Sequence, residues 1–596
     1  MLNRKKREEK FIKYLIIGLL LFLSGCNAQF PIITKTQTIP NSEIIKMNTV
    51  TIQAIHFEKA FFHSGEPAKW SVIITSDSSK EMTIRLVSRI SHLDRIITEI
   101  AQDIDLNRVE QQVEFTWQPP LDTPMGYGLD VYLETLNGQL ISTIKSVGFD
   151  VLEMWTQMPR YGFLTDFQPG RTDIARPISI MTDHHINALQ FYDWMYRHEQ
   201  FLTTEEPYVD LLGRQLSRQV IDELIKAAHA RNIDAMPYTA IYGASIDFYR
   251  QHPDWALYLA KGKPALFGNN FMAIMDPRVD GPWMRHLLNQ FEEILTQTQF
   301  DGIHLDQYGD PKVGYDINGN FIDLAVELPK SIDATKAVVD KFKPGGAVVF
   351  NCVTNWPTEQ VANSSEDIIY IEVWPPYTSF TDLHALIVSA QNIGHGKPVV
   401  LAAYVHPQGS ANPQINDAII FASGGGHIEL GEGNNYLADP YFPKYESLST
   451  SQAETIKRYY DFAVRYQNWM GPQTQDATGK WMNEISIPGF ETSNSLSYNK
   501  IYPLIRETKG VTAISLVNLL GLPGGDWNQP VPNPEPQSEF ELMLEIGNQK
   551  VSSIGFTSPD NENFAISSLE FTQENGQLHF KVPGLNIWDL IIVQWE

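Results

Sequence analysis

The stretch that decides the fold is FDGIHLDQYGD, at residues 300–310. Its segment Gly302–Leu305 is a short apolar run, bounded by turn-forming residues and followed by the carboxylate of Asp306. This pattern is typical of a buried parallel strand that ends in a polar loop. A second segment of the same kind, IIYIEVW at residues 368–374, places Glu372 at its end. In a barrel of parallel strands, the carboxyl ends of all strands lie on the face that carries the chemistry.

Two carboxylates at strand ends of one barrel favour glycoside hydrolysis. In that reaction one carboxyl group acts on the leaving oxygen and the other acts at the anomeric carbon. The same residues also permit a structural interpretation, in which Asp306 caps the following turn or helix and Glu372 lies at the rim. The two segments alone leave both interpretations open.

Strand–helix alternation continues on both sides of this stretch, from about residue 152 to residue 470. Helical periodicity lies between several of the strands, as in the apolar face that follows the candidate cap Ser217. Eight βα units predict a (β/α)8 TIM barrel and an α/β fold class. A doubly wound sheet is the alternative, but no G-x-G-x-x-G follows the first strand. The eight expected strands are Tyr161–Asp166, Ile186–Tyr192, Ala235–Thr239, Gly302–Asp306, Ala347–Asn351, Ile368–Glu372, Val399–Tyr404 and His427–Leu430.

Both flanks of this region are rich in strand patterns. Residues 48–151 contain several short segments with alternating apolar positions, separated by proline and glycine turns, which predicts an immunoglobulin-like β-sandwich. Residues 471–596 return to the same kind of pattern and predict a C-terminal β-sandwich. Neither flank shows a candidate site of its own.

The N-terminus is interpreted as a targeting segment. A basic region precedes the apolar run Tyr14–Leu23, which is too short for an ordinary transmembrane helix. The run leads into LSGC at residues 23–26, which resembles a bacterial lipoprotein lipobox. The resemblance implies lipidation of Cys26 after removal of the preceding signal, with 27–47 as a tether. We therefore expect an extracytoplasmic, cell-surface or membrane-anchored lipoprotein; the alternative is a secreted chain without lipid.

The composition restricts the class of partner. The chain of 596 residues has a net charge of −25, which argues against nucleic acid as a partner. Only two cysteines are present, so with Cys26 lipidated no disulfide forms and Cys352 is expected to be a buried free thiol. No tight metal-ligand spacing stands out, and neither a metal nor another cofactor is expected. The pair His184-His185 is expected at the surface or at the N-terminal rim.

Aromatic and polar residues gather at the predicted strand ends. Aromatic faces pack on sugar faces, while carboxylates and amides bond to hydroxyl groups, so this accumulation favours a carbohydrate cleft. The predicted substrate-binding residues are Tyr192, Asp193, Tyr196, Tyr242, His304, Gln307, Trp374, Glu432 and Asn435.

Four of these segments resemble the signatures of glycoside hydrolase family 66. They are FYDWMYRH at 191–198, DGIHLDQ at 301–307, EVWP at 372–375, and His427–Glu432. The family contains endo-dextranases and cycloisomaltooligosaccharide glucanotransferases. The resemblance implies a retaining mechanism on α-1,6-glucan (dextran and isomaltooligosaccharides), with Asp306 as nucleophile and Glu372 as general acid/base.

The spacing of the predicted strands separates the two activities of that family. The glucanotransferases carry an extra carbohydrate-binding module within the barrel domain. Here the longest interval, Thr239 to Gly302, leaves no room for a module on the order of a hundred residues. An endo-dextranase is therefore expected; the alternatives are a glucanotransferase and a non-catalytic surface glucan-binding lipoprotein. Membrane contact is expected through the lipid anchor only.

Overall fold

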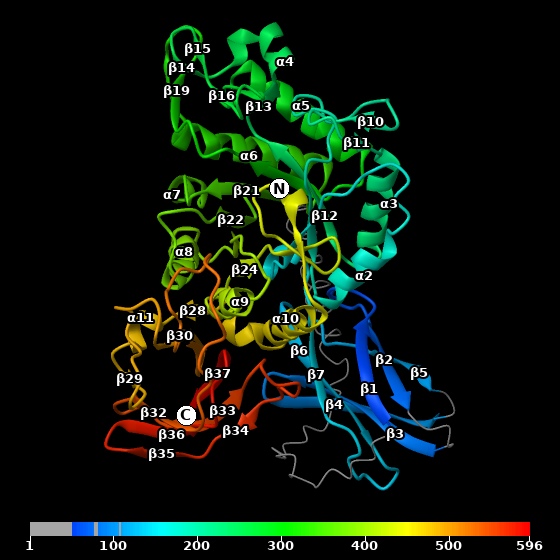
Figure 1. Ribbon diagram of the computed structural model, residues 1–596, viewed down its shortest axis with the longest axis vertical. Coiled ribbons are helices and arrows are strands. Elements are labelled where there is room, and N and C mark those ends of the chain that lie inside the picture. The colour runs from blue at the N-terminus through cyan, green and yellow to red at the C-terminus, as the bar shows by residue number, and fades with distance from the viewer. Residues whose placement is uncertain (1–49, 77–81, 107–108) are drawn as a thin grey trace, which may run out of the picture. The chain divides into compact units, whose positions relative to one another are not determined.

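The computed structural model of the protein describes residues 50–76, 82–106 and 109–596 (Figure 1). The predicted lipobox with Cys26, and the tether that follows it, lie outside the described residues. Within the part of the chain that is described, no helix combines the length and the apolar character needed to cross a membrane.

A curled sheet of parallel strands occupies the middle of the sequence. Each of the eight predicted segments contains one of its strands, and every adjacent pair is parallel. In spatial order they are β24 (Gly426–His427), β23 (Val399–Ala402), β22 (Ile368–Glu372), β21 (Ala347–Val353), β18 (Gly302–Asp306), β12 (Asp234–Ala240), β9 (Ala188–Phe191) and β8 (Tyr161–Leu164).

The eighth segment is split into two pieces that pair with opposite ends of the sheet. Its first piece, β24, pairs with β23. Its second piece, β25 (Leu430–Gly431), pairs with β8 through Gly431 and Phe163. The first and seventh strands are therefore both bonded to the short segment 426–431, which explains why the sheet curls.

Helices follow most of the strands and pack on the outer face of the sheet. Side chains alternate along each strand, so in β18 Ile303 and Leu305 belong to the core shared with the helices. His304 points to the inner face, where its ring lies near those of Tyr161 and Tyr370. The main helices are α2 (Ala175–Asp183), α3 (Arg218–His229), α5 (Pro282–Gln297), α6 (Leu324–Phe342), α8 (Phe380–Ile393), α9 (Asn412–Ala422) and α10 (Thr450–Met470).

Helix α3 shows how the local sequence sets these elements. The Ser217 hydroxyl accepts a hydrogen bond from the backbone N–H of Val220, so Ser217 caps the helix as predicted. The predicted apolar face from Val220 to Ala228 is buried. Between β12 and β18 the chain adds only α5, two short helical turns and small strands, among them β13 (Gly243–Ser245), β14 (Tyr258–Ala260), β16 (Leu266–Phe267) and β17 (Met272–Ile274).

The N-terminal flank is a two-sheet β-sandwich. Its two sheets enclose one apolar core, in which Trp70 and Phe115 stack with ring centroids 5.5 Å apart. One sheet has the order β1 (Val50–Phe57), β2 (Ala68–Ser76), β5 (Glu110–Trp117), and the other has the order β4 (Arg95–Leu106), β3 (Met82–His92), β6 (Met125–Glu134), β7 (Lys145–Val151).

Helix α10 lies directly on this sandwich. A Cβ atom added to Gly126 or Gly148 would meet a backbone oxygen of α10 at 2.2 Å or 2.1 Å, so only glycine allows this approach. A Cβ on Gly128 would meet the guanidinium of Arg465 at 2.3 Å. That guanidinium forms a buried ion pair with Asp130, with Arg465 Nη1 and Asp130 Oδ1 2.6 Å apart.

The C-terminal flank is a second pair of sheets around its own apolar core. Its longest strands are β30 (Ile501–Thr508), β31 (Val511–Asn518), β33 (Val551–Thr557) and β37 (Trp588–Trp595) in one sheet, and β32 (Phe540–Glu545), β35 (Phe571–Glu574) and β36 (Gln577–Val582) in the other. The protein is thus a β-rich α/β protein that combines a curled parallel sheet with β-sandwich sheets.

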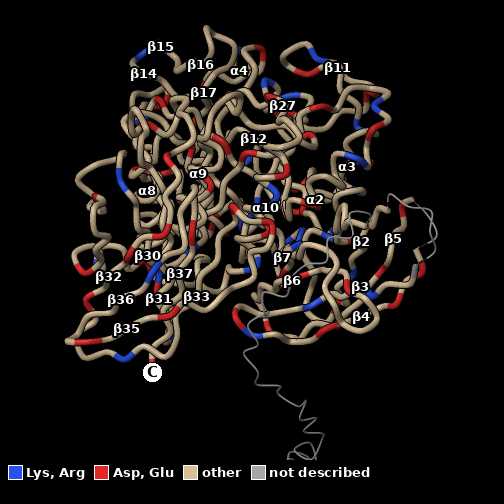
Figure 2. Tube along the Cα trace, turned by 60° about the horizontal axis from the view of Figure 1, so that its bottom comes forward, with Lys and Arg blue, Asp and Glu red and all other residues tan. Residues whose placement is uncertain are grey.

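Two sequence expectations about side chains are tested by burial and charge. Cys352 is buried and free, as predicted. His184 and His185 are buried just before β9, so of the two expected positions the surface is wrong and the N-terminal rim fits; His185 Nε2 lies 2.8 Å from Asp461 Oδ1 of α10, which explains its burial. Figure 2 shows acidic and basic residues interspersed along the described chain.

Candidate active site

The carboxylates of Asp306 and Glu372 come from strands that are separated by a single strand. Asp306 ends β18 and Glu372 ends β22, and β21 lies between them in the sheet. The strand between them contributes Asn351, whose backbone is in register with Tyr370 of β22. Parallel register therefore brings three polar side chains to the same edge of the sheet. We call Asp306 and Glu372 the carboxylate pair.

Asn351 bridges the carboxylate pair. Its amide nitrogen Nδ2 donates to Asp306 Oδ1 at 2.8 Å and to Glu372 Oε2 at 3.0 Å. These two oxygens can be no further apart than the sum of the two distances. That limit lies below the roughly 6.5–9.5 Å between the carboxyl groups of inverting glycosidases and close to the roughly 5–5.5 Å of retaining ones.

The remaining oxygens of the carboxylate pair receive tyrosine hydroxyls. Tyr238, on β12, donates to Asp306 Oδ2 at 2.7 Å, and Tyr404 donates to Glu372 Oε1 at 3.0 Å. Every oxygen of the pair thus accepts a hydrogen bond from a side chain. Such donors hold the carboxyl groups in fixed orientations and favour their ionised forms.

Burial has the opposite effect to those donors, because it disfavours the ionised form and raises the pKa of each carboxyl group. Burial, together with the negative charge of Glu372, raises the pKa of Asp306 to about 7 despite the hydrogen bonds from Tyr238 and Asn351. Burial also raises the pKa of Glu372 above its ordinary value. Two carboxyl groups this close resist simultaneous ionisation, so one of them keeps its proton to a higher pH than an isolated carboxyl group would. A pair with one proton can supply an acid and a nucleophile at the same time.

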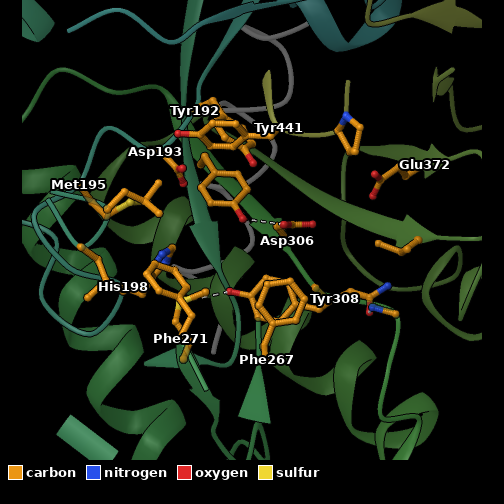
Figure 3. Close-up of a pocket in the computed structure, with 18 of the residues that line it drawn as sticks. Tyr192, Asp193, Met195, His198, Phe267, Phe271, Asp306, Tyr308, Glu372 and Tyr441 are labelled. Carbon is orange, nitrogen blue, oxygen red and sulfur yellow. Dashed lines mark hydrogen bonds between the residues drawn. The ribbon is translucent and has the colours of Figure 1, made fainter. Parts of the chain in front are cut away.

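A cavity of about 700 Å³ opens over the carboxylate pair. In Figure 3, Glu372 lies on one side of the cavity, Met195 and His198 lie on the opposite side, and Asp306 lies between them. Aromatic rings form much of the wall: Phe267 and Tyr308 are stacked with centroids 4.1 Å apart, and Tyr192 and Tyr441 lie nearby. A cavity of this size and lining suits a neutral ligand with flat apolar faces and hydroxyl groups.

The comparisons with known proteins agree with this site. A model of glycosyl hydrolase family 66 matches residues 57–592. The chain belongs to glycosyl hydrolase family 66. It is therefore an enzyme of the glycoside hydrolase type, as its sequence motifs indicated.

Two relatives in this family are named as glucanotransferases. Two proteins of Niallia circulans, each named cycloisomaltooligosaccharide glucanotransferase, are 23% identical to this chain, over 717 and 724 aligned positions. The alignments cover 93% and 94% of this chain and 73% and 74% of the relatives. Since each alignment is longer than the 596 residues of this chain, each relative contains residues with no counterpart here.

The fold is also shared with a solved structure of family 66. A cycloisomaltooligosaccharide glucanotransferase of Paenibacillus sp., complexed with cycloisomaltoheptaose, superposes with a TM-score of 0.84 at 21% sequence identity. The match covers 91% of this chain and 99% of the other. The curled sheet and the sandwiches are thus arranged as in a family 66 enzyme.

The structure places five of the predicted substrate-binding residues in the lining of the cavity over the carboxylate pair. They are Tyr192, Asp193, Tyr196, Gln307 and Trp374. Asp193 has a left-handed backbone with φ of +50°, and burial raises its pKa to about 6. Arg214 donates to the carbonyl oxygen of Asp193 at 2.8 Å, which fixes this strained residue. Backbone strain of this kind is often concentrated at functional sites.

Tyr242 and His304 do not line the cavity, so direct contact of either residue with substrate stays a prediction. Tyr242 is fully buried behind Tyr308 and accepts a hydrogen bond from its backbone N–H at 2.8 Å. His304 is buried within the curled sheet, with its Nδ1 3.0 Å from the hydroxyl of Tyr161. Both residues support neighbours of the carboxylate pair from behind.

Glu432 and Asn435 also lie outside the cavity lining, and their contact with substrate likewise stays a prediction. The carboxylate of Glu432 accepts from the backbone N–H groups of Thr165 and Asp166 and pairs with Arg171 at 2.7 Å. Asn435 donates to the carbonyl oxygen of Glu432 at 3.0 Å. These contacts tie the segment after the eighth strand to the segment after the first.

Sequence reasoning missed four residues that the structure brings to the site. Tyr238, Asn351 and Tyr404 bond to the carboxylate pair, and His198 lines the cavity. Burial lowers the pKa of His198 to about 4, so its imidazole is neutral, and its buried Nδ1 has no hydrogen-bond partner. The available signal was position: the first three lie at or just after the ends of predicted strands.

Proposed function

We propose that this protein is a retaining endo-dextranase, which hydrolyses internal α-1,6-glucosidic linkages. Asp306 is the nucleophile and Glu372 is the general acid/base. The observation that carries the proposal is the Asn351 bridge, because it keeps Asp306 Oδ1 and Glu372 Oε2 within the sum of its two hydrogen bonds, 2.8 Å and 3.0 Å, which is nearer to the spacing of retaining enzymes than to that of inverting ones.

The proposed reaction has two steps. In the first, ionised Asp306 attacks the anomeric carbon while Glu372 gives its proton to the departing glycosidic oxygen, so a covalent glucosyl ester forms and a shortened glucan leaves. In the second, Glu372 takes a proton from water, the water oxygen attacks the anomeric carbon, and the ester bond to Asp306 breaks. The two inversions return the α configuration.

A single proton on the pair explains how one residue serves as acid and then as base. While Asp306 is ionised, its charge favours the protonated form of Glu372. Once Asp306 has become an ester, that charge is gone, and the pKa of Glu372 falls toward the value that a base requires. The hydrogen bond from Tyr404 to Glu372 Oε1 supports the ionised form in the second step.

Two observations support dextran as the substrate and hydrolysis as the outcome. The relatives named above are enzymes of isomaltooligosaccharides, and one was solved with cycloisomaltoheptaose. Those relatives contain segments without a counterpart here, and the interval between β12 and β18 holds only α5, two short helical turns and small strands. A module that could hold the far end of a glucan for ring closure is therefore not found in that interval.

The first experiment compares substrates and products. The protein is incubated with dextran, starch and pullulan, and the products are resolved by size and mass. Endo-dextranase activity gives a falling ladder of linear isomaltooligosaccharides from dextran and leaves starch intact. Rings, each lighter by one water than the linear product of equal length, would favour the glucanotransferase function that the relatives bear. Binding of dextran without any cleavage would favour the surface glucan-binding function.

The second experiment tests the retaining mechanism. Proton NMR recorded during the first minutes of dextran hydrolysis should show the α-anomer of the new reducing end before mutarotation. A β-anomer appearing first would overturn the covalent role of Asp306, even if both carboxylates proved essential.

The third experiment tests the acid. Glu372→Gln should slow dextran, which has a poor leaving group, far more than an activated aryl isomaltoside, which departs without a proton. Asn355→Gln, an amide change at a residue outside the cavity lining, serves as the control and should slow both substrates equally little. Equal slowing of both substrates by Glu372→Gln would reject it as the acid.

We interpret the curled sheet as a (β/α)8 barrel and the N-terminal sandwich as immunoglobulin-like. The pairing of segment 426–431 with both β23 and β8 supports the barrel. On this interpretation the catalytic barrel spans 152–470, flanked by sandwiches at 48–151 and 471–596.

The proposal also includes anchoring through Cys26, which the variant Cys26→Ser tests. Loss of the anchor should release the protein from the membrane fraction. Stable anchoring needs more than one acyl chain.

A further inference from the structure

Three side chains of the types that bind metal ions meet on the outer side of the curled sheet, away from the cavity. They are Asp417 of α9, His427 of β24, and Glu429 just after β24, and we call them the buried cluster. His427 Nδ1 lies 3.0 Å from Asp417 Oδ1 and 3.0 Å from Glu429 Oε2. All three side chains are fully buried. The residue between them, Ile428, belongs to the core inside the sheet, so the cluster lies on the opposite side, toward the helices.

The histidine in the buried cluster is oriented for a cation. Its other nitrogen, Nε2, lies 3.3 Å from the carbonyl oxygen of Ala403, which can only accept a hydrogen bond. A carbonyl partner places a proton on Nε2, so in the neutral imidazole the lone pair of Nδ1 is directed at the two carboxylates. In that state three acceptors face one another, as the ligands of a cation do.

Unpartnered atoms around the cluster point to the same conclusion. Asp417 Oδ2 and Glu429 Oε1 are buried and accept no hydrogen bond. The hydroxyl of Tyr436, a fully buried side chain from a different strand, lies next to Glu429 but makes no hydrogen bond of ordinary length and angle. Buried polar atoms are rarely left without a partner, because each costs the desolvation free energy of the group.

With both carboxyl groups ionised, the cluster carries a net negative charge. Two carboxylates contribute −2, and His427 contributes at most +1. Among the residues that the structure describes, no lysine or arginine forms an ion pair with Asp417 or Glu429. A divalent ion with a neutral imidazole would bring the sum to zero.

We propose that Asp417, His427 and Glu429 bind a divalent first-row transition ion, with the Tyr436 hydroxyl as a further ligand. Neighbouring ligands of a six-coordinate ion with bonds of about 2.1 Å lie about 3.0 Å apart. The spacing of His427 Nδ1 from both carboxylate oxygens has this value. One imidazole with two carboxylates suits Mn²⁺, Fe²⁺ or Zn²⁺ better than Ca²⁺ or Mg²⁺, which prefer oxygen ligands alone.

The position of the ion indicates a structural role. It joins α9 to the eighth strand segment, which bonds to both ends of the curled sheet. Through Ala403 it also fixes the residue before Tyr404, whose hydroxyl bonds to Glu372. We therefore expect the ion to stabilise the fold and to take no part in the chemical step.

The test measures metal content. The full chain is produced in medium that contains Mn²⁺, Fe²⁺ and Zn²⁺, purified without a metal-affinity step, and analysed by inductively coupled plasma mass spectrometry. We expect close to one ion per chain. His427→Ala and Glu429→Gln should lower this at least about tenfold. The control is Glu366→Gln, another fully buried carboxylate with two unpartnered oxygens but outside the cluster, which should keep the ion.

A second measurement covers variants that fail to fold. Wild-type protein dialysed against a strong chelator should melt several degrees lower, and returning the ion should restore the melting temperature. The proposal is overturned if the wild type holds less than about 0.1 ion per chain and takes up none on incubation with the three ions. It is equally overturned if folded His427→Ala retains the ion. In either case the cluster would be an imidazolium held between two carboxylates.

Discussion

The two ends of β18 carry the same residue type in opposite environments. Asp301, just before the strand, accepts from His229 Nε2 at 2.7 Å and from the backbone N–H of Ala235 at 2.8 Å, and it pairs with Lys343 at 3.0 Å. Asp306, at the other end, receives only neutral donors and faces the charge of Glu372. The two carboxyl groups lie within one strand of five residues and its preceding residue.

Their pKa values move in opposite directions. Burial alone would raise the pKa of Asp301, but the hydrogen bonds and positive charges of His229 and Lys343 outweigh it, so the pKa is lowered. For Asp306 burial prevails and the pKa rises to about 7. The comparison teaches that burial alone does not mark a reactive carboxylate. The absence of a cationic partner is the additional mark: Asp301 is neutralised by its cations and stabilises the fold, whereas Asp306 has no cationic partner and is available for chemistry.

The largest expected effect is on turnover. Asp306→Asn keeps the shape of the side chain and removes the attacking charge, so kcat on dextran should fall by a factor on the order of a thousand or more. Asp301→Asn, at the opposite end of the same strand, should change kcat by less than about twofold, because it lies away from the cavity. A folded Asp306→Asn protein with activity within about tenfold of wild type would reject the assignment of the nucleophile.

The second prediction reverses the comparison and concerns stability. Asp301→Asn leaves His229 and Lys343 without their shared anion, and should lower the free energy of unfolding at neutral pH by about 1–3 kcal/mol. Because the folded-state pKa of Asp301 is lowered, its contribution is present above the ordinary aspartate value and is lost as the pH falls through the folded-state value. Urea unfolding at pH 7 and at pH 3 checks this; an equal deficit at both would contradict it.

The third prediction separates the two members of the carboxylate pair. Tyr238→Phe removes a donor to Asp306, so the pKa of the nucleophile rises and the acidic limb of the kcat/KM profile moves to higher pH. Tyr404→Phe removes a donor to Glu372, so the alkaline limb moves to higher pH instead. Each shift should be about one pH unit or less. If both variants move the same limb, the two roles are not divided as proposed.

The smallest expected effect is a gain of stability at the active site. The raised pKa of Asp306 means that its ionisation opposes folding: stability is lost as the pH rises from the ordinary value through about 7. Asp306→Asn should therefore raise the melting temperature by a few degrees at pH 8 and hardly at all at pH 4. Differential scanning calorimetry at the two pH values measures the difference. A melting temperature that falls at pH 8 would show that the ionised carboxylate stabilises the fold.

Much of the fold could be read from the sequence because its signals are local. Each of the eight short apolar runs contains a strand of the curled sheet, and α3 begins at its predicted cap, Ser217. The split of the eighth strand was not predictable, since it depends on pairing with two distant partners, β23 and β8.

The site was predictable only where a residue's position along its strand determined its direction. Asp306 and Glu372 were found because each directly follows an apolar run, at the strand end where a barrel carries its chemistry, and because both lie in the segments that resemble family 66. Tyr242 and Glu432 also carry polar groups near the same edge of the sheet, but tertiary contacts hold them outside the cavity lining. Asn351 was passed over because a single amide gives no signal until the strands on either side are known.

The contact between α10 and the N-terminal sandwich limits how this enzyme can be taken apart. Gly126 and Gly148 bring the helix backbone onto the sheet, Gly128 leaves space for the guanidinium of Arg465, and Arg465 has its carboxylate partner, Asp130, in the sandwich. A shortened version without the sandwich would expose the face of α10 that packs on it. It would also leave the guanidinium of Arg465 without its carboxylate partner. The front part is thus not a detachable spacer: a gene trimmed to the strand–helix region should yield aggregated protein, and swapping in another sandwich would require the same three glycines and the same aspartate.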